Sequence, residues 1–598
     1  MFTKIFVVAV AIGFLVIPAS GNTIFKEKEQ VEEIINLPNS FDLRDYNGEN
    51  YVTSVKDQTG GTCWAHGTMS AVEGNLVMTG NFQGTEEPNL AEYHLDWWNG
   101  FNRHNNDDDP SGPGLTVHNG GDYLVSSAYF TRGEGAVYSS LANDNSEADD
   151  VWYNSPPKRF DYTYDLYYPK DIEWYVAGND LENIDVIKEK LMTEGVIGTC
   201  MCYSGQFIEE GYIHYQPADS TYPPNHAIAI VGWDDDKVTQ APEPGAWLCK
   251  NSWGSGWGLN GYFWISYYDK HAGQNPEMGA VSFQDVELLK YDNIYYHDYH
   301  GWRDTLDGVH EAFNAFTAEN QERIDAVSFY TSVNNEEYEI KIYDDYSNGE
   351  LLNEIYSKTG FIEYIGYHTI ELDETIGFPE GDDFYVYVNL LNGGQPFDRT
   401  SEIEVLLGAY TTGVTVYSDS NPGESFYRSE EEWIDFYTYD FADNRHDNTA
   451  NFCIKVLTNQ WIPDGPDLYC NGDIRLSNVK ALSIIDTEFM LKNIGKENSE
   501  LNWEITEWPE WGMWTIKPKS GTNLRPAYGA LDVQVKFLIP NQKDSVFTGH
   551  IKIENKDNPD DVEIIDVVIT TAKAKPMPVI FSSIYERLSS KLPFLFNN

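Results

Sequence analysis

The sequence contains very little cysteine. Six cysteines occur among 598 residues, namely Cys63, Cys200, Cys202, Cys249, Cys453 and Cys470. This scarcity excludes a small scaffold held together by disulfides. Cys200 and Cys202 are one residue too close for a Cys-x-x-Cys pair, and no second pair occurs, so no zinc site of that kind is predicted. Cys453 and Cys470 are near enough in sequence to pair with each other or to remain free thiols.

Positive charge is also scarce. The chain has 39 Lys and Arg against 95 Asp and Glu, which gives a formal net charge of −56. Nucleic-acid binding depends on neutralising phosphates with basic side chains, so nucleic acid is not an expected partner. Attraction to anionic lipid is disfavoured for the same reason. We expect most of the carboxylates to form a solvated acidic surface.

Long hydrophobic runs are limited to the N-terminus. An apolar run from Ile5 to Ile17 follows Lys4, and small residues after it fit a cleavage site. This pattern predicts a secretory signal peptide over residues 1–21 and therefore a secreted protein, with an uncleaved membrane anchor as the alternative. No later run reaches membrane-spanning length, so no transmembrane span is predicted. Residues 22–36 form a short charged connector.

The rest of the chain is too long for one hydrophobic core and divides into several regions. Residues 37–287 mix helical and strand patterns, whereas residues 288–460 and 461–575 show alternating strands separated by turn sequences. The fold class is therefore multidomain, with an α+β region followed by two all-β sandwich domains. Residues 576–598 form an apolar and basic tail, interpreted either as a terminal helix or as a surface-attachment segment.

Two helices and three strands are predicted within the first region. The segment TCWAHGTMSAVEGNLVM has apolar residues at helical spacing from Cys63 onward, and Asp180 to Leu191 is a second amphipathic helix. Three apolar segments are predicted to be buried strands: HAIAIVGW, AWLCKNSW and GYFWISYYD.

Several residues near these elements carry the chemistry of a thiol nucleophile. Cys63 opens the first helix, where the helix dipole favours a thiolate. His226 is the candidate base, and Asn251 is the candidate group that orients the imidazole. Trp253 would cover that hydrogen bond from water. Gln58, five residues before Cys63, is the candidate donor to an oxyanion.

The order of these motifs resembles the papain-like cysteine peptidases. LPNSFDLRD, TGGTCWA, NHAIAIVGW and KNSWGSGWGLNGYFWIS correspond to four segments of that family, over residues 37–287. The resemblance implies a papain-like α+β fold with a helical left half and a β-barrel right half. It also implies that Gly120 and Gly121, in HNGGD, bind substrate through their backbone.

The sequence departs from the family in several places. Gly60 occupies the position of a cysteine that family members usually have, and His66 replaces an aromatic residue. The Gln-to-Cys interval is one residue shorter than usual. Acidic insertions at 101–114 and 140–150 lengthen the spacing to the histidine and asparagine.

No cofactor is required by this chemistry. Asp107, Asp108 and Asp109 in the first insertion offer hard oxygen ligands for Ca²⁺, and a solvated acidic loop is the simpler interpretation.

The second and third regions also resemble known domains. YDNIYYHDYHGW, GESFYRSEEEW and NFCIKV resemble the lectin-like domain that follows papain-like domains in secreted archaeal and bacterial proteins. This resemblance implies a jelly-roll-like sandwich and glycans or a cell surface as partners. Residues 461–575, with LNWEITEWPEWGMW, resemble an immunoglobulin-like or BACON-like sandwich.

The function expected from these features is hydrolysis of peptide bonds by a secreted cysteine peptidase. Peptides or proteins are the expected substrates. The alternative is a cell-surface adhesion or carbohydrate-binding protein whose peptidase domain is vestigial. Vestigial copies typically lose the cysteine or the histidine, and this chain retains Cys63, His226, Asn251 and Gln58, which favours the enzyme.

Overall fold

The computed structural model describes most of the chain from residue 37 onward. The described residues are 37–84, 86–106, 108, 114–139, 151–276, 278–403 and 414–573. The predicted signal peptide and connector, the insertion at 140–150 and the C-terminal tail from 576 lie outside the described residues.

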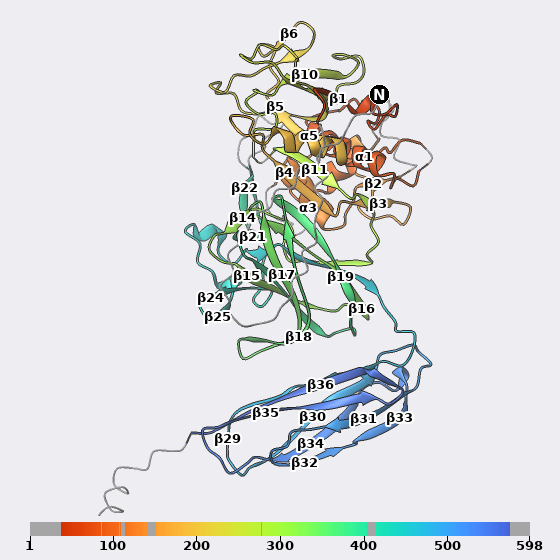
Figure 1. Ribbon diagram of the computed structural model, residues 1–598, viewed down its shortest axis with the longest axis vertical. Coiled ribbons are helices and arrows are strands. Elements are labelled where there is room, and N and C mark those ends of the chain that lie inside the picture. The colour runs from red at the N-terminus through yellow and green to blue at the C-terminus, as the bar shows by residue number, and fades with distance from the viewer. Residues whose placement is uncertain are drawn as a thin grey trace, which may run out of the picture. The chain divides into compact units, whose positions relative to one another are not determined.

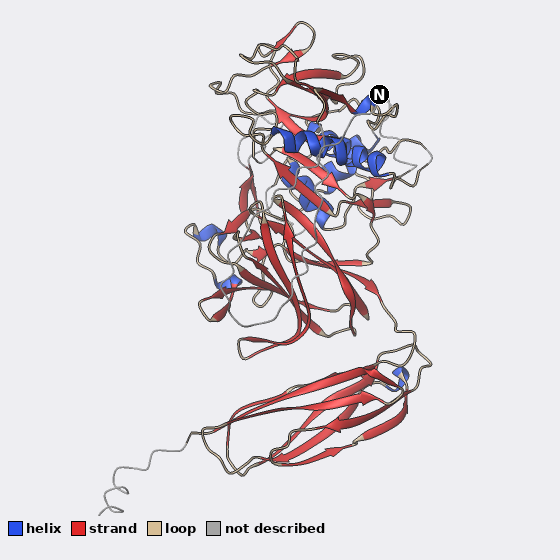
Figure 2. Cartoon of the chain, viewed as in Figure 1, coloured by secondary structure: helices blue, strands red, loops and turns tan. Residues whose placement is uncertain are grey.

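Among the described residues of the first region there are five α-helices, which Figure 2 shows clustered in this part of the chain. They are α1 (Cys63–Thr79), α2 (Glu92–Trp98), α3 (Tyr123–Thr131), α4 (Val151–Asn154) and α5 (Ile184–Thr193). The strands are β1 (Ser40–Asp42), β2 (Val137–Tyr138), β3 (Asp165–Tyr168), β4 (Asp171–Tyr175), β5 (Ile197–Met201), β6 (Ile208–Glu209), β7 (Ile213–His214), β8 (His226–Asp234), β9 (Ala246–Lys250), β10 (Tyr262–Ser266), β11 (Ala280–Gln284) and β12 (Glu287–Leu288).

The elements predicted for this region are present in the structure. The helix predicted from Cys63 is α1, and the helix predicted from Asp180 starts four residues later, at the start of α5. The three predicted buried strands are β8, β9 and β10, which pair in that order and antiparallel. The fold class predicted from the sequence is confirmed for this region and for the β-rich region after it.

The second region is a sandwich of two sheets. One sheet has the order β18-β17-β20-β15-β24-β25, and the other includes β13, β27, β16 and β19. Ile340 and Val386 from the first sheet pack in one hydrophobic core with Val327 and Val456 from the second. The strands are β13 (Asn293–Tyr295), β14 (Asp304–Leu306), β15 (Glu311–Thr317), β16 (Glu322–Thr331), β17 (Glu336–Ser347), β18 (Glu350–Ile362), β19 (Gly366–Phe378), β20 (Asp383–Leu390), β21 (Gln395–Asp398), β22 (Ser401–Ile403), β23 (Val414–Val416), β24 (Ser425–Ser429), β25 (Glu432–Asp435), β26 (Asn451–Phe452) and β27 (Ile454–Gln460).

The first two regions share one sheet, which the sequence patterns do not predict. Strand β19 of the second region pairs antiparallel with β4 of the first, with Tyr367 opposite Ile172. The strand order therefore runs β13-β27-β16-β19-β4-β11-β5-β8-β9-β10-β7-β6 without a break. The Tyr168 and Tyr367 hydroxyls lie 2.8 Å apart and add a buried contact across the same junction. Figure 1 shows β4, β11 and β5 in the first region and β16 and β19 in the second.

The third region is also a sandwich. A four-stranded sheet with the order β28-β30-β34-β32 and a five-stranded sheet with the order β29-β36-β35-β31-β33 enclose one core around Trp503. The strands are β28 (Leu468–Asn471), β29 (Ile474–Val479), β30 (Ile484–Asn493), β31 (Leu501–Glu507), β32 (Met513–Lys517), β33 (Ser520–Leu524), β34 (Leu531–Leu538), β35 (Val546–Asn555) and β36 (Asn558–Thr571). The immunoglobulin-like or BACON-like identity of this region remains a prediction.

All six cysteines are buried free thiols, so Cys453 and Cys470 do not pair. Cys453 packs in the core that the first two regions share, whereas Cys470 packs in the core of the third region. Proximity in sequence therefore did not indicate proximity in the fold.

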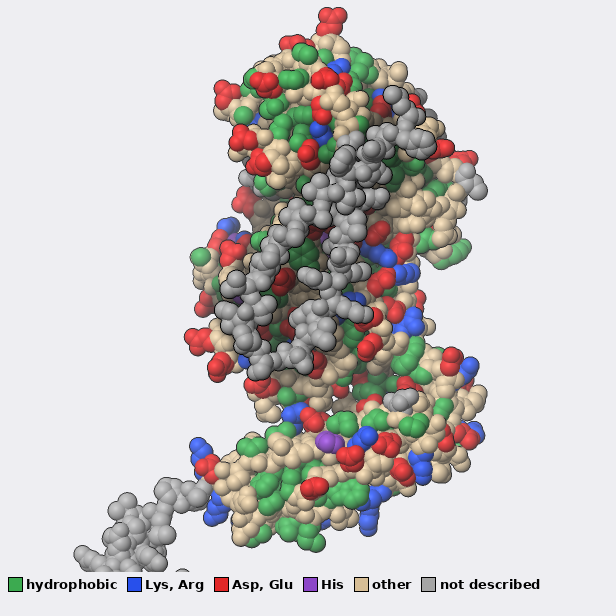
Figure 3. All heavy atoms as spheres, viewed as in Figure 1, with side chains coloured by type: hydrophobic (Ala, Val, Ile, Leu, Met, Phe, Trp, Pro, Cys, Tyr) green, Lys and Arg blue, Asp and Glu red, His purple; other side chains and the backbone are tan. Residues whose placement is uncertain are grey.

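Acidic side chains are spread over the face of the molecule that Figure 3 shows. Figure 3 shows Asp and Glu side chains scattered over the visible face, with fewer Lys and Arg among them. Among the described residues, no helix has both the length and the apolar character needed to cross a membrane.

A buried ion-pair cluster involves Glu73, in the C-terminal half of α1. Lys56 Nζ donates to Glu73 Oε1 on α1 at 2.6 Å and also to Glu92 on α2, and Thr53 Oγ1 donates to Glu73 Oε2 at 2.6 Å. Glu73 is fully buried and Lys56 is nearly so. Burial lowers the pKa of Lys56, but the charges of Glu73 and Glu92 and the hydrogen bonds to them outweigh this effect and raise the pKa above its ordinary value. The cluster ties α1 and α2 to the chain two residues before Gln58.

Replacing Lys56 should destabilise the first region strongly. In Lys56→Met, Glu73 and Glu92 remain buried without their cation, and breaking a buried pair in this way costs about 3–5 kcal/mol in the free energy of unfolding. Denaturant unfolding measures this cost. Lys158→Met is the control, because the Lys158–Asp161 pair is at the surface, and it should leave the unfolding midpoint unchanged. Equal midpoints for wild type and Lys56→Met would contradict the role given to the cluster.

Candidate active site

Cys63 is the first residue of α1 and is almost completely buried. Helix α1 packs closely on the central sheet because Gly67 has no side chain. A Cβ at Gly67 would lie 2.7 Å from the Tyr123 hydroxyl and 3.4 Å from the Ala227 Cβ. This close approach puts the Cys63 thiol within hydrogen-bonding reach of the backbone N–H of Ala227, the residue after His226.

His226 and Asn251 form a direct hydrogen bond. His226 begins β8 and Asn251 directly follows β9, so the pairing of these strands brings the two side chains together. His226 Nε2 lies 2.7 Å from Asn251 Oδ1. The amide oxygen can only accept, so Nε2 carries the proton and a neutral His226 keeps its Nδ1 lone pair. The backbone N–H of Ser252 also donates to Asn251 Oδ1, at 2.8 Å, which fixes the amide orientation.

Three aromatic rings cover this pair. The Trp253 ring stacks on His226 with a centroid distance of 4.4 Å and an interplanar angle of 21°. Tyr203 and Trp257 contact Trp253 edge-on at 4.6 and 5.1 Å. The Trp253 ring therefore covers one face of the imidazole, and Tyr203 and Trp257 pack around Trp253.

Gln58 is held in place from both ends of its amide. Ser252 Oγ donates to Gln58 Oε1 at 2.6 Å, and the Gln58 backbone N–H donates to the Ser252 carbonyl at 2.7 Å. Gln58 Nε2 donates one hydrogen to the Gly60 carbonyl at 2.9 Å, which leaves the second hydrogen of the amide for another acceptor. Ser252 therefore links Gln58 to the histidine–asparagine pair.

Burial disfavours a charge on either reacting group alone. It raises the pKa of the Cys63 thiol to about 11, although the backbone N–H groups of Ala227, Trp64 and Cys63 lower it in part. Burial likewise lowers the pKa of His226 to about 4, against the effect of the Asn251 hydrogen bond. The backbone N–H groups at the start of α1 favour the thiolate, as expected from sequence, and burial opposes the charge on each group taken alone.

The predicted glycine stretch lies beside the nucleophile. Gly120 has φ of +97°, a backbone conformation that favours glycine, and its N–H donates to the Gly61 carbonyl at 2.9 Å. A Cβ at Gly121 would meet the Trp64 ring at 2.6 Å. The stretch is thereby fixed against the turn that precedes Cys63, with the Gly61 N–H bonded to the His118 carbonyl at 2.8 Å.

Some contacts around the site are not indicated by any sequence pattern. At Gly60, where the family usually has a cysteine, a Cβ would meet the Tyr153 hydroxyl at 3.0 Å and the His118 Cβ at 3.3 Å. The His118 and Tyr153 rings stack at 4.0 Å, and His118 Nδ1 bonds to Asp96. These aromatic and polar contacts occupy the place where a disulfide would lie. Tyr153 follows an insertion, and no local pattern indicates its contact.

Two other placements complete the comparison with the sequence. His66 is a buried helix residue whose Nδ1 lies 2.9 Å from the Thr62 carbonyl, as expected for a core position. Ser252, which follows Asn251 directly, was not singled out. Its position directly after Asn251 is the sequence feature that could have indicated a role for Ser252 in the site.

Two family models match this chain. Residues 37–280 match the papain family of cysteine proteases, and residues 294–458 match the lectin-like domain family. The chain has a papain-family cysteine protease domain followed by a lectin-like domain. The sequence patterns predict boundaries of 37–287 and 288–460 for these two domains.

Curated relatives align with the protease domain. Cathepsin Q of Rattus norvegicus is 27% identical over 251 residues, which are 38% of this chain and 62% of cathepsin Q. Cathepsin J of Mus musculus is 26% identical over 271 residues, which are 44% of this chain and 67% of cathepsin J. The chain therefore spans less than two thirds of the length of cathepsin Q.

One solved structure shares the two-domain arrangement. The cysteine protease and lectin-like domains of Cwp84, a surface layer associated protein of Clostridium difficile, superpose with a TM-score of 0.56 at 21% identity. The match covers 71% of this chain and 90% of that structure. A second Cwp84 structure, solved after propeptide cleavage, gives the same TM-score at 22% identity. At these identities the likeness shows the fold.

Removing the Trp253 ring should raise the pKa of His226. Burial lowers this pKa because it penalises the charged imidazolium, so opening the site to water in Trp253→Ala moves the value from about 4 toward the ordinary 6.5. NMR of the full chain labelled with ¹⁵N-histidine, titrated from pH 3 to 8, measures the pKa of His226. Trp257→Ala is the matched control, since Trp257 contacts Trp253 rather than His226. An unchanged His226 pKa in Trp253→Ala would show that the ring does not shield the pair.

Proposed function

We propose that this protein is a secreted cysteine peptidase that hydrolyses peptide bonds through Cys63, His226 and Asn251. The observation that carries the proposal is the His226–Asn251 hydrogen bond of 2.7 Å, covered by Trp253 and adjacent to the buried thiol at the start of α1. The papain-family match over residues 37–280 supports the same chemistry. A vestigial protease domain is not favoured, since the reacting groups are all retained in one site.

The mechanism follows from the proton positions. The Cys63 S–H proton moves to His226 Nδ1 as the sulfur attacks the peptide carbonyl carbon, so thiolate and imidazolium form together. This coupled transfer fits the pKa values, because burial opposes either charge alone. The Cys63 N–H and the second Gln58 Nε2 hydrogen are the proposed donors to the oxyanion.

The leaving amine takes the proton from His226 Nδ1 as the C–N bond breaks, which leaves a thioester on Cys63. Water then attacks the thioester carbonyl and gives a proton to His226, and the peptide acid leaves as the thiol is restored. Gly120 and Gly121 are the proposed backbone contacts for the substrate. No cofactor enters any of these steps.

An extracellular or cell-surface location fits this function. The related Cwp84 is a surface layer associated protein, and the apolar run at residues 5–17 is the segment that would direct export. We expect peptides or proteins outside the cell to be the substrates.

A thiol-directed epoxide should modify Cys63 alone. Incubating the full chain with an epoxide inactivator, followed by peptide mapping, should give one adduct on the peptide with Cys63 and loss of peptidase activity. Cys63→Ala should show neither adduct nor activity. Cys202→Ala is the matched control, because Cys202 is also a buried free thiol, and it should react and cleave as wild type does. Peptide cleavage by Cys63→Ala at the wild-type rate would sink the proposal.

For the lectin-like domain we propose glycan binding at an aromatic pocket on the sandwich. The pocket has a volume of about 810 Å³, and its lining includes Phe316, Tyr346, Tyr385 and Phe426 together with the acceptors Asp383 and Glu424. Aromatic faces pack on the apolar face of a sugar ring, and carboxylates accept from its hydroxyls.

The glycan proposal is tested with the full chain, since β19 pairs with β4 and an isolated lectin-like domain would lose that neighbour. A glycan array probed with Cys63→Ala should give a restricted set of hits. Tyr385→Ala should bind those hits about tenfold more weakly, which corresponds to the loss of one aromatic contact. Tyr417→Ala, at an exposed tyrosine that is absent from the pocket lining, should bind normally. A blank array would leave the domain with a structural role.

A further inference from the structure

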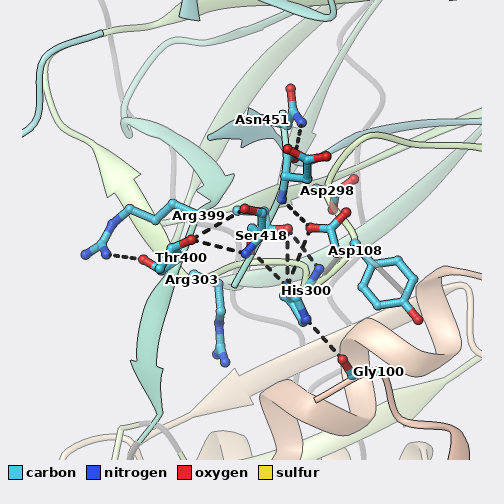
Figure 4. A network of polar contacts seen from close by, with 12 residues as sticks. Gly100, Asp108, Asp298, His300, Arg303, Arg399, Thr400, Ser418 and Asn451 are labelled. Carbon is cyan, nitrogen blue, oxygen red and sulfur yellow. Dashed lines mark hydrogen bonds and ion pairs between the residues drawn. The ribbon is translucent and has the colours of Figure 1, made fainter. Parts of the chain in front are cut away.

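Three side chains from the two domains converge at the junction between them. Asp108 lies in the acidic insertion of the protease domain, whereas His300 and Asp398 belong to the lectin-like domain. One ligand atom from each residue lies within 4.8 Å of the other two. His300 Nδ1 is 3.9 Å from an oxygen of each carboxylate. His300 and Asp398 are buried. Figure 4 shows the polar network around these residues, with Asp108 and His300 labelled.

The hydrogen bonds of His300 leave its Nδ1 without a hydrogen. Nε2 lies 3.0 Å from the Gly100 carbonyl, which can only accept, so Nε2 carries the proton of a neutral ring. Ser418 Oγ lies 2.9 Å from Nδ1 and 2.8 Å from Asp398 Oδ1, and its single hydrogen can serve only one of them. His300 Nδ1 and Asp398 Oδ1 can therefore both accept a hydrogen bond here, but Ser418 has only one hydrogen to donate.

Two further buried side chains, Asp298 and Asn106, have polar atoms without a hydrogen-bond partner among the described residues. Asp298 is fully buried, and its Oδ2 has no hydrogen-bond partner among the described residues, although Oδ1 accepts from Lys455 Nζ at 2.7 Å. Figure 4 shows Asp298 in the same network. Asn106, two residues before Asp108, is 5% exposed, and both polar atoms of its side chain lack such a partner within the same part of the chain. Buried polar atoms without partners are costly unless a ligand satisfies them.

The other contacts of the two carboxylates include backbone hydrogen bonds. The Asp419 N–H donates to Asp108 Oδ2 at 2.7 Å, and the His300 N–H donates to Asp398 Oδ2 at 2.9 Å.

We propose that Asp108, His300 and Asp398 hold a divalent cation that joins the acidic insertion of the protease domain to the lectin-like domain. The cation satisfies the free lone pair of His300 Nδ1 and neutralises the two carboxylates. The charge and the nitrogen-plus-oxygen donor set suit Zn²⁺ or Mn²⁺, while the surrounding oxygens suit Ca²⁺.

The site has a structural consequence for the protease domain. The insertion that carries Asp108 is bonded to the chain leading to the glycine stretch, through the Arg103 N–H and the Leu115 carbonyl at 2.9 Å. A cation at Asp108 would fasten this segment to the lectin-like domain. Its removal would loosen the insertion without touching Cys63 or His226.

The test measures ion binding by the full chain in the Cys63→Ala background, which removes the thiol as a competing zinc ligand. After treatment with EDTA and dialysis, Ca²⁺, Zn²⁺ and Mn²⁺ are titrated separately by calorimetry. We expect one equivalent of at least one ion to bind and to raise Tm by about 2 °C or more at an ion concentration 100-fold above Kd. Hydrogen exchange of peptides covering residues 101–106 should slow on binding.

Variants separate this site from other acidic groups. Asp398→Asn and Asp108→Asn should each weaken binding at least tenfold, and Asp108→Asn serves if Asp398→Asn does not fold. Asp171→Asn is the matched control. Asp171 pairs with His368 at the same domain junction, but among the described residues this pair does not belong to a group that could hold a metal ion. The variant should therefore bind the ion as wild type does. His300→Gln should abolish Zn²⁺ or Mn²⁺ binding and should weaken Ca²⁺ binding less.

Two results would overturn the proposal. One is the absence of binding and of any Tm change with all three ions. The other is binding that survives undiminished in both Asp108→Asn and Asp398→Asn, which would place the ion elsewhere.

Discussion

The close packing of helix α1 on the central sheet is the constraint on which the active site depends. Gly67 and Gly74 lie on the face of α1 toward the sheet, where a Cβ would come within 2.7 Å of the Tyr123 hydroxyl and 2.5 Å of Val196. A larger residue at either position would push the helix away from β8. Since Cys63 begins α1 and His226 begins β8, that shift would separate the thiol from the imidazole. The glycines of this helix therefore matter because they let α1 lie close to the sheet, and not because they make the backbone flexible.

The sequence was informative where function is carried by short segments. The motifs around Cys63, His226 and Asn251 each stand next to a regular element, so the helix and strands that hold them could be predicted from the same residues. The position of Gln58 was harder to predict because it depends on a side chain from another segment. Ser252 Oγ supplies that contact at 2.6 Å, from 194 residues away. No periodic pattern in the sequence indicates a hydrogen bond between two residues so far apart in the chain.

The features that could not be predicted are contacts between distant segments. The pairing of β4 with β19 joins two strands about 200 residues apart, and each strand pattern is complete without it. The replacement of a disulfide by the stacked rings of His118 and Tyr153 is similar, because Gly60 reveals a missing cysteine but not what takes its place. The choice between a Cys453–Cys470 disulfide and two free thiols could not be made for the same reason, since nearness in sequence does not show that the two residues lie in different cores.

The shared sheet changes how the lectin-like domain should be regarded. An accessory domain on a linker could be removed without exposing backbone, but removing this one would leave β4 with unpaired N–H and C=O groups along one edge. Such edges attract other strands and promote aggregation. The same removal would uncover Tyr168, whose hydroxyl contacts Tyr367 and Thr369. The lectin-like domain is therefore part of the structural support of the protease domain, whether or not it binds a glycan. Its continuity with β11, β5 and β8 connects it to the strand that carries His226.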